Sequence, residues 1–219
     1  MKKTVYSLVL SEDVIREVDK LAYQSGTNRS NMVNQILAEY VSLITPEKRM
    51  SHLLAEVRRH FAETAGFQLP EGGSAGMMNL RTALHYKYNP TVRYCLELSR
   101  DNNSIGTLRV SLRTQNMQLI LRMMDFYNLW DAVEKMFIGP QNSVIEGERY
   151  YRVLMLQSAV PQGYLLGSEA LGNLLADYIA TFDAALKLYF AEPEPQSRAT
   201  RGKIERLYRD YTERQGVAV

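Results

Sequence analysis

The chain has 219 residues, of which 46% are apolar and 23% charged, and its net charge at pH 7 is +2. This composition is typical of a globular protein with room for two domains. One cysteine, Cys95, excludes a framework of intrachain disulfides and fits a reducing, cytoplasmic location. No apolar run approaches the length of a membrane span, so we expect no membrane partner.

The first segment, residues 4–10, alternates with a period of two and predicts a strand. One face of this strand carries three large apolar side chains, and the other carries two valines and a serine. These faces are Tyr6, Leu8 and Leu10, and Val5, Ser7 and Val9.

Two short amphipathic helices are predicted to follow the strand. Ser11 is expected to cap the first, with Glu12 and Asp13 in its first turn, where the helix dipole favours anions. Gly26 suits a left-handed residue after that helix, and Asn28 is expected to cap the second. The apolar positions at helical spacing are Val14, Val18, Leu21 and Ala22, and then Val33, Ile36, Leu37, Tyr40 and Val41.

One strand and two helices, in residues 1–45, are too few to bury a core alone. A lone strand also leaves its backbone donors and acceptors unpaired. Pairing two copies antiparallel across a twofold axis would solve both problems and stack four helices over one face of a two-stranded ribbon. A ribbon of that width fits the major groove of DNA.

Residues 3–43 resemble a ribbon-helix-helix domain of the Arc/MetJ/CopG type. Leu8–Val14 is similar to the strand-to-helix junction of that family, and Gly26–Met32 is similar to its turn between helices. The resemblance implies a homodimer that inserts its ribbon into double-stranded DNA and holds phosphates at the start of the second helix. The implied base-reading residues are Val5, Ser7 and Val9, and the implied phosphate-binding residues are Asn28, Arg29, Ser30, Lys2 and Lys3.

The reading positions depart from the family pattern, in which polar or basic side chains are usual. Valine can touch a thymine methyl group but cannot hydrogen-bond a base edge. Three alternatives follow. Sequence selectivity is modest, or Lys2, Lys3 and Thr4 contribute to reading, or the unit only dimerises, as in an antitoxin or scaffold protein.

The second part, residues 46–191, predicts an α+β domain: an antiparallel sheet with helices packed on one face. A helix begins at Pro46, and a glycine-rich connection follows it. The expected strands are 78–88, 92–99, 107–114 and 149–157, and the expected helices are 116–138 and 168–190. We expect this domain to serve ligand sensing, oligomerisation or both.

The outward face of the predicted sheet is rich in basic side chains. Its charged and titratable residues are Arg81, His85, Lys87, Arg93, Glu97, Arg109 and Arg113. Such a face would suit a small anionic effector, an acidic partner or nucleic acid. The alternative is an ordinary solvated sheet face.

Residues 192–219 predict a stiff linker followed by a basic helix. This helix either touches DNA or a partner, or packs on its own domain or its dimer mate. We find no catalytic motif and predict no enzymatic activity. The histidines His52, His60 and His85 do not show metal-ligand spacing with Cys95, so we expect neither a metal nor a cofactor. The sequence as a whole predicts a dimeric transcriptional regulator, for example a prokaryotic repressor.

Overall fold

The computed structural model describes residues 7–40, 46–70, 76–100, 104–156, 167–215 and 219. The chain divides into two compact units, residues 1–49 and residues 50–219.

The first unit contains two helices, α1 (Glu12–Gln24) and α2 (Arg29–Tyr40). Gly26 has a φ of 60° between them, as its place in the sequence predicts. The backbone N–H of Gly26 donates to Tyr23 and that of Thr27 donates to Ala22, a Schellman arrangement that satisfies the last carbonyls of α1. A small core of Val18, Ala22 and Met32 joins the helices.

The predicted strand at 4–10 is not confirmed. Residues 4–6 lie outside the described residues, and Ser7–Leu10 are exposed and irregular. A strand needs a neighbouring strand to fill its hydrogen bonds, and none of the described segments of the single chain supplies one. Ser11 occupies the N-cap position of α1, but its side chain makes no capping hydrogen bond.

The second unit is built on an antiparallel sheet of six strands among the described residues, which confirms the α+β class. The strands lie in the order β1-β2-β3-β4-β6-β5, and each pairs antiparallel with its neighbour. Their bounds are β1 (Phe67–Gln68), β2 (Met77–Ala83), β3 (Thr91–Leu98), β4 (Gly106–Leu112), β5 (Ser143–Glu146) and β6 (Arg149–Leu154).

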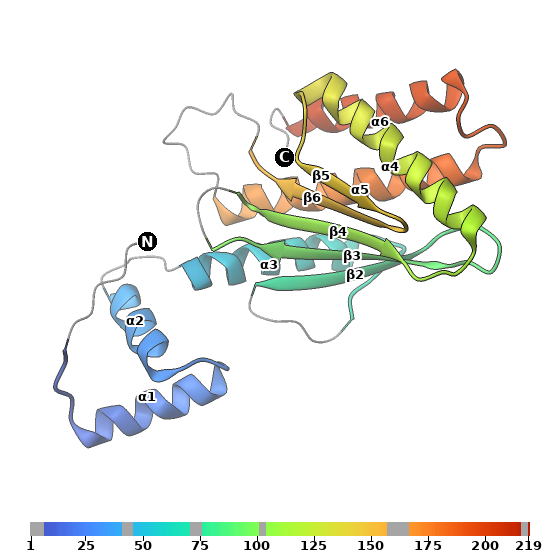
Figure 1. Cartoon of the computed structure of the whole chain (residues 1–219). Helices are drawn as coiled ribbons and strands as arrows, with labels where there is room; N and C mark the ends of the chain where they lie inside the picture. The colour runs from blue at the N-terminus through green and yellow to red at the C-terminus, as the bar shows by residue number, and fades with distance from the viewer. Residues whose placement is uncertain (1–6, 41–45, 71–75, 101–103, 157–166, 216–218) are drawn as a thin grey trace. The chain divides into compact units, whose positions relative to one another are not determined.

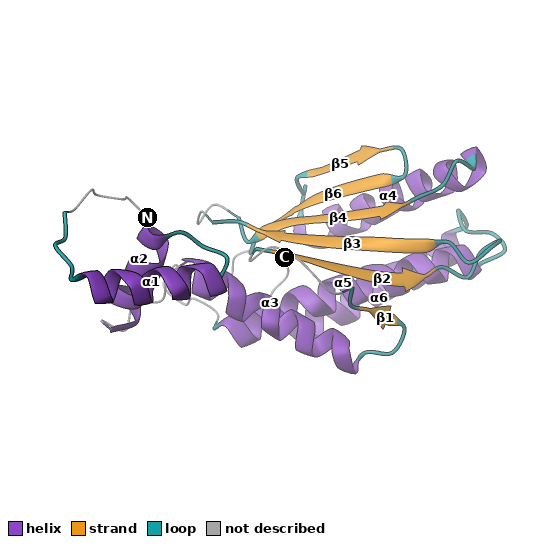
Figure 2. Ribbon diagram, turned by 90° about the horizontal axis from the view of Figure 1, so that it is seen from below, coloured by secondary structure: helices purple, strands orange, loops and turns teal. Residues whose placement is uncertain are grey.

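Four helices accompany the sheet: α3 (Pro46–Glu63), α4 (Met117–Ile138), α5 (Ser168–Ala191) and α6 (Arg198–Gln215). Figure 1 shows α4, α5 and α6 on one side of the sheet, and the view from below in Figure 2 shows none of these three helices on the opposite face, which we call the bare face. The burial pattern agrees, because every second residue of β2, β3, β4 and β6 is buried.

The core between sheet and helices is aromatic, and Phe182 of α5 lies near its centre. Its ring meets Tyr94 of β3, Phe126 and Trp130 of α4, and Tyr150 of β6, with centroids 5.0 to 6.2 Å apart. These contacts join α4 and α5 to the sheet in one continuous cluster.

Helix α6 packs on the other helices of its own unit. Ile204, Tyr208 and Tyr211 are fully buried, and the Tyr208 ring lies 5.3 Å from that of Trp130 in α4. Tyr211 meets Tyr178 of α5. The sequence leaves open whether this helix contacts DNA or a partner, or packs; the structure shows α6 packed on its own unit.

Two groups of buried polar side chains lie within this core. The Arg152 Nε donates to Glu134 at 2.9 Å, both side chains are fully buried, and Tyr178 donates to the second oxygen of Glu134 at 2.8 Å. Asp183 of α5 accepts from Thr82 and Tyr94 of the sheet, at 2.7 and 2.8 Å. Neither group is predicted from the sequence.

Candidate nucleic-acid interface

The start of α2 has the features expected of an anion-binding helix terminus. The Asn28 side chain accepts from the backbone N–H of Asn31 at 3.0 Å, so the predicted cap is present. Asn28, Arg29 and Ser30 are all exposed. The positive end of the helix dipole and the first amides of α2 therefore face solvent, where an anionic group can approach.

Arg29, the predicted phosphate-binding residue, forms an ion pair with a carboxylate. Its Nε and Nη2 donate to the two carboxylate oxygens of Asp19 in α1, at 2.7 and 2.6 Å. Hydrogen bonding to Arg29 lowers the pKa of Asp19, so the pair stays charged at neutral pH. A guanidinium has five N–H donors, and this bond uses two of them. The remaining donors can reach a phosphate while Asp19 fixes the orientation of the side chain.

Asp19 is the residue of this site that sequence reasoning missed. It lies ten residues before Arg29 and directly follows the buried Val18 in α1. A carboxylate in α1 and an arginine at the start of α2 are an available signal once the turn between the helices is recognised.

The two helices and the segment before them leave many large apolar side chains exposed. Leu8 is 54% exposed, Leu37 51%, Val14 46% and Leu21 44%. Leu10 and Ile36 are each 38% exposed. Single exposed apolar residues are ordinary, but this unit has many of them for its size.

The predicted base-reading and lysine positions are described only in part. Lys2, Lys3 and Val5 lie outside the described residues. Ser7 is exposed, and the side chain of Val9 is fully exposed. Ser7–Leu10 form no strand in the described part of the chain, so the structure does not bring Ser7 and Val9 into one reading surface.

A second set of candidate residues lies on the bare face of the sheet. Arg81, Arg93 and Arg109 are exposed and face outward from β2, β3 and β4. Arg113, also exposed, directly follows β4 and keeps the outward alternation. The register pairs Arg81 directly with Arg93, and Cys95 with Arg109. Burial raises the pKa of the Cys95 thiol, which keeps it protonated beside Arg109.

His85 and Lys87 are not part of that face. The predicted strand 78–88 ends at Ala83, and both residues lie exposed in the loop before β3. Tyr88 and Asn89 in this loop have positive φ values of 66° and 44°, which ends the extended conformation. The alternation that suggested a longer strand therefore continues into a turn.

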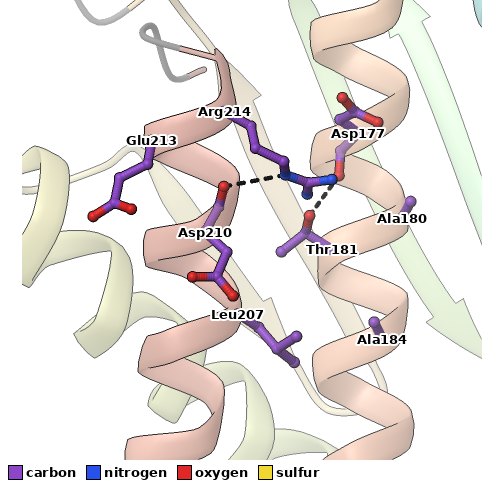
Figure 3. A pocket seen from close by; sticks show the side chains of 8 residues that line it. All are labelled: Asp177, Ala180, Thr181, Ala184, Leu207, Asp210, Glu213 and Arg214. Carbon is purple, nitrogen blue, oxygen red and sulfur yellow. Dashed lines mark hydrogen bonds between the residues drawn. The ribbon is translucent and has the colours of Figure 1, made fainter.

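A groove of about 720 Å³ lies between α5 and α6. Its polar lining includes Asp177, Asp210, Glu213 and Arg214, and Arg214 reaches from α6 towards α5 (Figure 3). Three carboxylates against one arginine repel an anion. The groove is thus a poor site for the predicted anionic effector.

The described residues contain no group of three or more His, Cys, Asp or Glu side chains that could hold a metal ion. Among the helices that are described, none has the length and apolar character to cross a membrane. Comparisons of the chain with family models, with curated proteins and with solved structures found no match.

Proposed function

We propose that the protein is a cytoplasmic, homodimeric DNA-binding regulator of transcription that inserts a two-stranded ribbon into the major groove. The exposed apolar side chains of the first unit, from Leu8 to Leu37, carry this proposal. Among the described residues of this unit, the buried apolar side chains are Val18, Ala22, Met32 and Ala38, which is too little buried area for stability alone. Covering the exposed apolar side chains with a second copy would supply the missing core.

The ribbon belongs to the same proposal. When two copies pair, Ser7–Leu10 of each chain gain a strand partner, which the single chain lacks. Leu8 and Leu10 then turn inward, and Ser7 and Val9 turn to the groove. Ser7 is the polar side chain on that reading face, so selectivity rests on few contacts and on the shape of the DNA.

The start of α2 has the supporting role of holding the phosphate backbone. Its exposed amides and the Arg29 guanidinium, oriented by Asp19, would fix the register of the ribbon in the groove. The second unit adds a separate surface to the regulator, and we assign no catalytic step to either unit.

The test is selection of binding sites from sheared genomic DNA by the full chain, followed by sedimentation of the protein alone. We expect enrichment of a small set of related sites with twofold symmetry, bound by a dimer. A dimer that enriches no fragment would reject the DNA-reading role.

The alternative function is a dimerisation module in an interaction protein. Two observations favour it: the reading positions carry valine, and Arg29 already has a carboxylate partner. The same experiment separates the two functions, because the alternative predicts the dimer and no selected DNA.

A further inference from the structure

The bare sheet face of the second unit gathers four arginines around one position. Arg81 is directly opposite Arg93 in the register. Because Arg93 pairs with Ser111, its diagonal neighbours are Arg109 on β4 and Arg113 directly after β4, two residues to either side of Ser111. Directly opposite side chains on a sheet face lie about 5 Å apart at Cβ, and diagonal ones roughly 7–8 Å. Arg93 thus stands at the centre of a compact cluster, which we call the arginine face.

A carboxylate shares the outward face, because Glu97 of β3 is exposed and lies diagonal to Arg109. None of the four arginines forms an ion pair with a described carboxylate, whereas Arg29, Arg59, Arg152 and Arg201 all do. Like charges directly opposite on a sheet destabilise it. In an exposed cluster of this kind the positive charges repel one another, and a bound anion would remove that repulsion.

The shape of the face indicates an extended anion. The described helices of the second unit pack on the other side of the sheet, and the groove between α5 and α6 is lined by other residues (Figures 2 and 3). A small anionic molecule would find no enclosing walls here. A polymer with regularly spaced charges can lie across several strands at once.

The chemistry of the face indicates phosphate on duplex DNA. Arginine binds phosphate oxygens through two parallel hydrogen bonds and is the preferred cation for such contacts. Proteins that hold single strands stack successive bases on several aromatic rings. Among the described outward-facing residues of β2, β3, β4 and β6, Tyr151 is the one aromatic. The face can therefore hold a backbone but lacks a platform for bases.

We propose that the arginine face binds the phosphate backbone of double-stranded DNA without sequence preference. The site consists of Arg81, Arg93, Arg109 and Arg113, and it is distinct from the ribbon and from the start of α2. This proposal rests on observations of the second unit alone. It is therefore independent of the proposal that the first unit recognises specific DNA sequences.

The test compares two triple variants of the full chain on a random-sequence duplex, by fluorescence anisotropy over a range of salt concentrations. The first is Arg81→Gln, Arg93→Gln and Arg109→Gln. The matched control is Arg58→Gln, Arg198→Gln and Arg206→Gln, which removes the same charge from exposed positions on helices. We expect the first variant to bind about tenfold more weakly and to lower the salt slope by roughly 2–3, the value for three lost phosphate contacts.

A second readout uses thermal stability without DNA. Removing clustered like charges should leave the melting temperature of the first variant unchanged or raise it, so weaker binding cannot be attributed to unfolding. Equal binding by both triple variants would overturn the proposal. So would tighter binding of poly-glutamate than of duplex DNA by the unmodified chain, because that result would indicate an acidic protein partner.

The two proposals fail in different ways. If the unmodified chain selects genomic sites and the arginine variant selects them with equal affinity, the arginine face is rejected and the regulator stands. If the arginine variant loses random-duplex binding while no site is ever selected, the face stands and sequence reading is rejected.

Discussion

The Glu134–Arg152 pair shows how much a single buried charge can determine. Both side chains are fully buried where α4 packs against β6, and the Tyr178 hydroxyl donates a second hydrogen bond to the Glu134 carboxylate. Arg152 also donates to Gln141 at 2.6 Å. Burial raises the pKa of Glu134 by desolvating its carboxylate, and Arg152 opposes that shift. Removing one partner leaves the other as an uncompensated charge in the core.

The first prediction follows from that pair. Arg152→Met should lower the free energy of unfolding by about 3–5 kcal/mol, because Glu134 loses its counter-charge. Adding Glu134→Leu to the same chain should recover most of the loss, since an apolar pair of similar volume has no charge to desolvate. Urea unfolding of the two variants measures both values. A double variant less stable than the single one would contradict this explanation.

The second prediction concerns Arg29 and Ser7 in the proposed regulator. Arg29→Ala should weaken binding to all duplexes alike and reduce the salt slope by about one ion, as a phosphate contact does. Ser7→Ala should instead change the preference among selected sites and leave random-duplex binding almost unchanged. Titrations against selected and random duplexes distinguish these patterns, and exchanged behaviour of the two variants would reject the assigned roles.

At the scale of elements, the long periodic segments were predictable and the short ones were not. Helix α4 begins at Met117 and α5 ends at Ala191, each one residue from its expected limit. Strands β1 and β5 have two and four residues, too few for a pattern with a period of two. Their positions are set by pairing with β2 and β6, which is a tertiary effect.

The candidate site was predictable to a similar degree. The cap at Asn28, the left-handed Gly26 and the shared face of Arg81, Arg93 and Arg109 follow from local rules of capping and alternation. The Arg29–Asp19 bond depends on how two helices cross, and the Asp183 group depends on α5 meeting the sheet. The Asp183 group has no local sequence signal, and the opposite charges of Asp19 and Arg29 become a signal only once the turn between α1 and α2 is recognised.

The third prediction contrasts two helix glycines. A Cβ on Gly172 of α5 would lie 2.5 Å from the Glu56 Cβ of α3, whereas one on Gly202 of α6 would meet nothing within 4 Å. Gly172→Ala should therefore destabilise the protein by about 1–3 kcal/mol through overpacking. Gly202→Ala should stabilise it by up to about 1 kcal/mol through helix propensity. Chemical denaturation gives both values, and equal effects would show that α3 and α5 separate easily.

At the scale of the whole molecule, the fourth prediction tests the dimer with two neighbouring residues. Leu8→Asp should abolish the proposed dimer, because it places a charge in the buried interface between the chains. Val9→Asp should leave the dimer intact and weaken DNA binding, since its carboxylate faces phosphate. Sedimentation of both variants provides the measurement. A dimer that survives Leu8→Asp would place the interface elsewhere.

The fifth prediction concerns alkaline pH. Burial raises the pKa of seven core tyrosines above the ordinary value of 10, namely Tyr94, Tyr127, Tyr150, Tyr178, Tyr189, Tyr208 and Tyr211. The unfolded chain ionises these groups first, so the stability they contribute is complete below about pH 10 and is lost as the pH rises further. Above about pH 10, each of these tyrosines should lower the free energy of unfolding by about 1.4 kcal/mol per pH unit. Absorbance at alkaline pH should show them ionising together with unfolding; ionisation in the folded protein would contradict their burial.

The two edge strands of the sheet have a consequence for self-association. One edge strand is β1 with two residues, and the other is β5 with four. A long open edge would invite the sheets of neighbouring molecules to join into fibres. Strand β5 pairs with four of the six residues of β6, whereas β1 pairs only with Arg81 and Thr82 of β2. Among the described strands, the β2 edge is therefore the longer open edge, and strand pairing between molecules is expected there first.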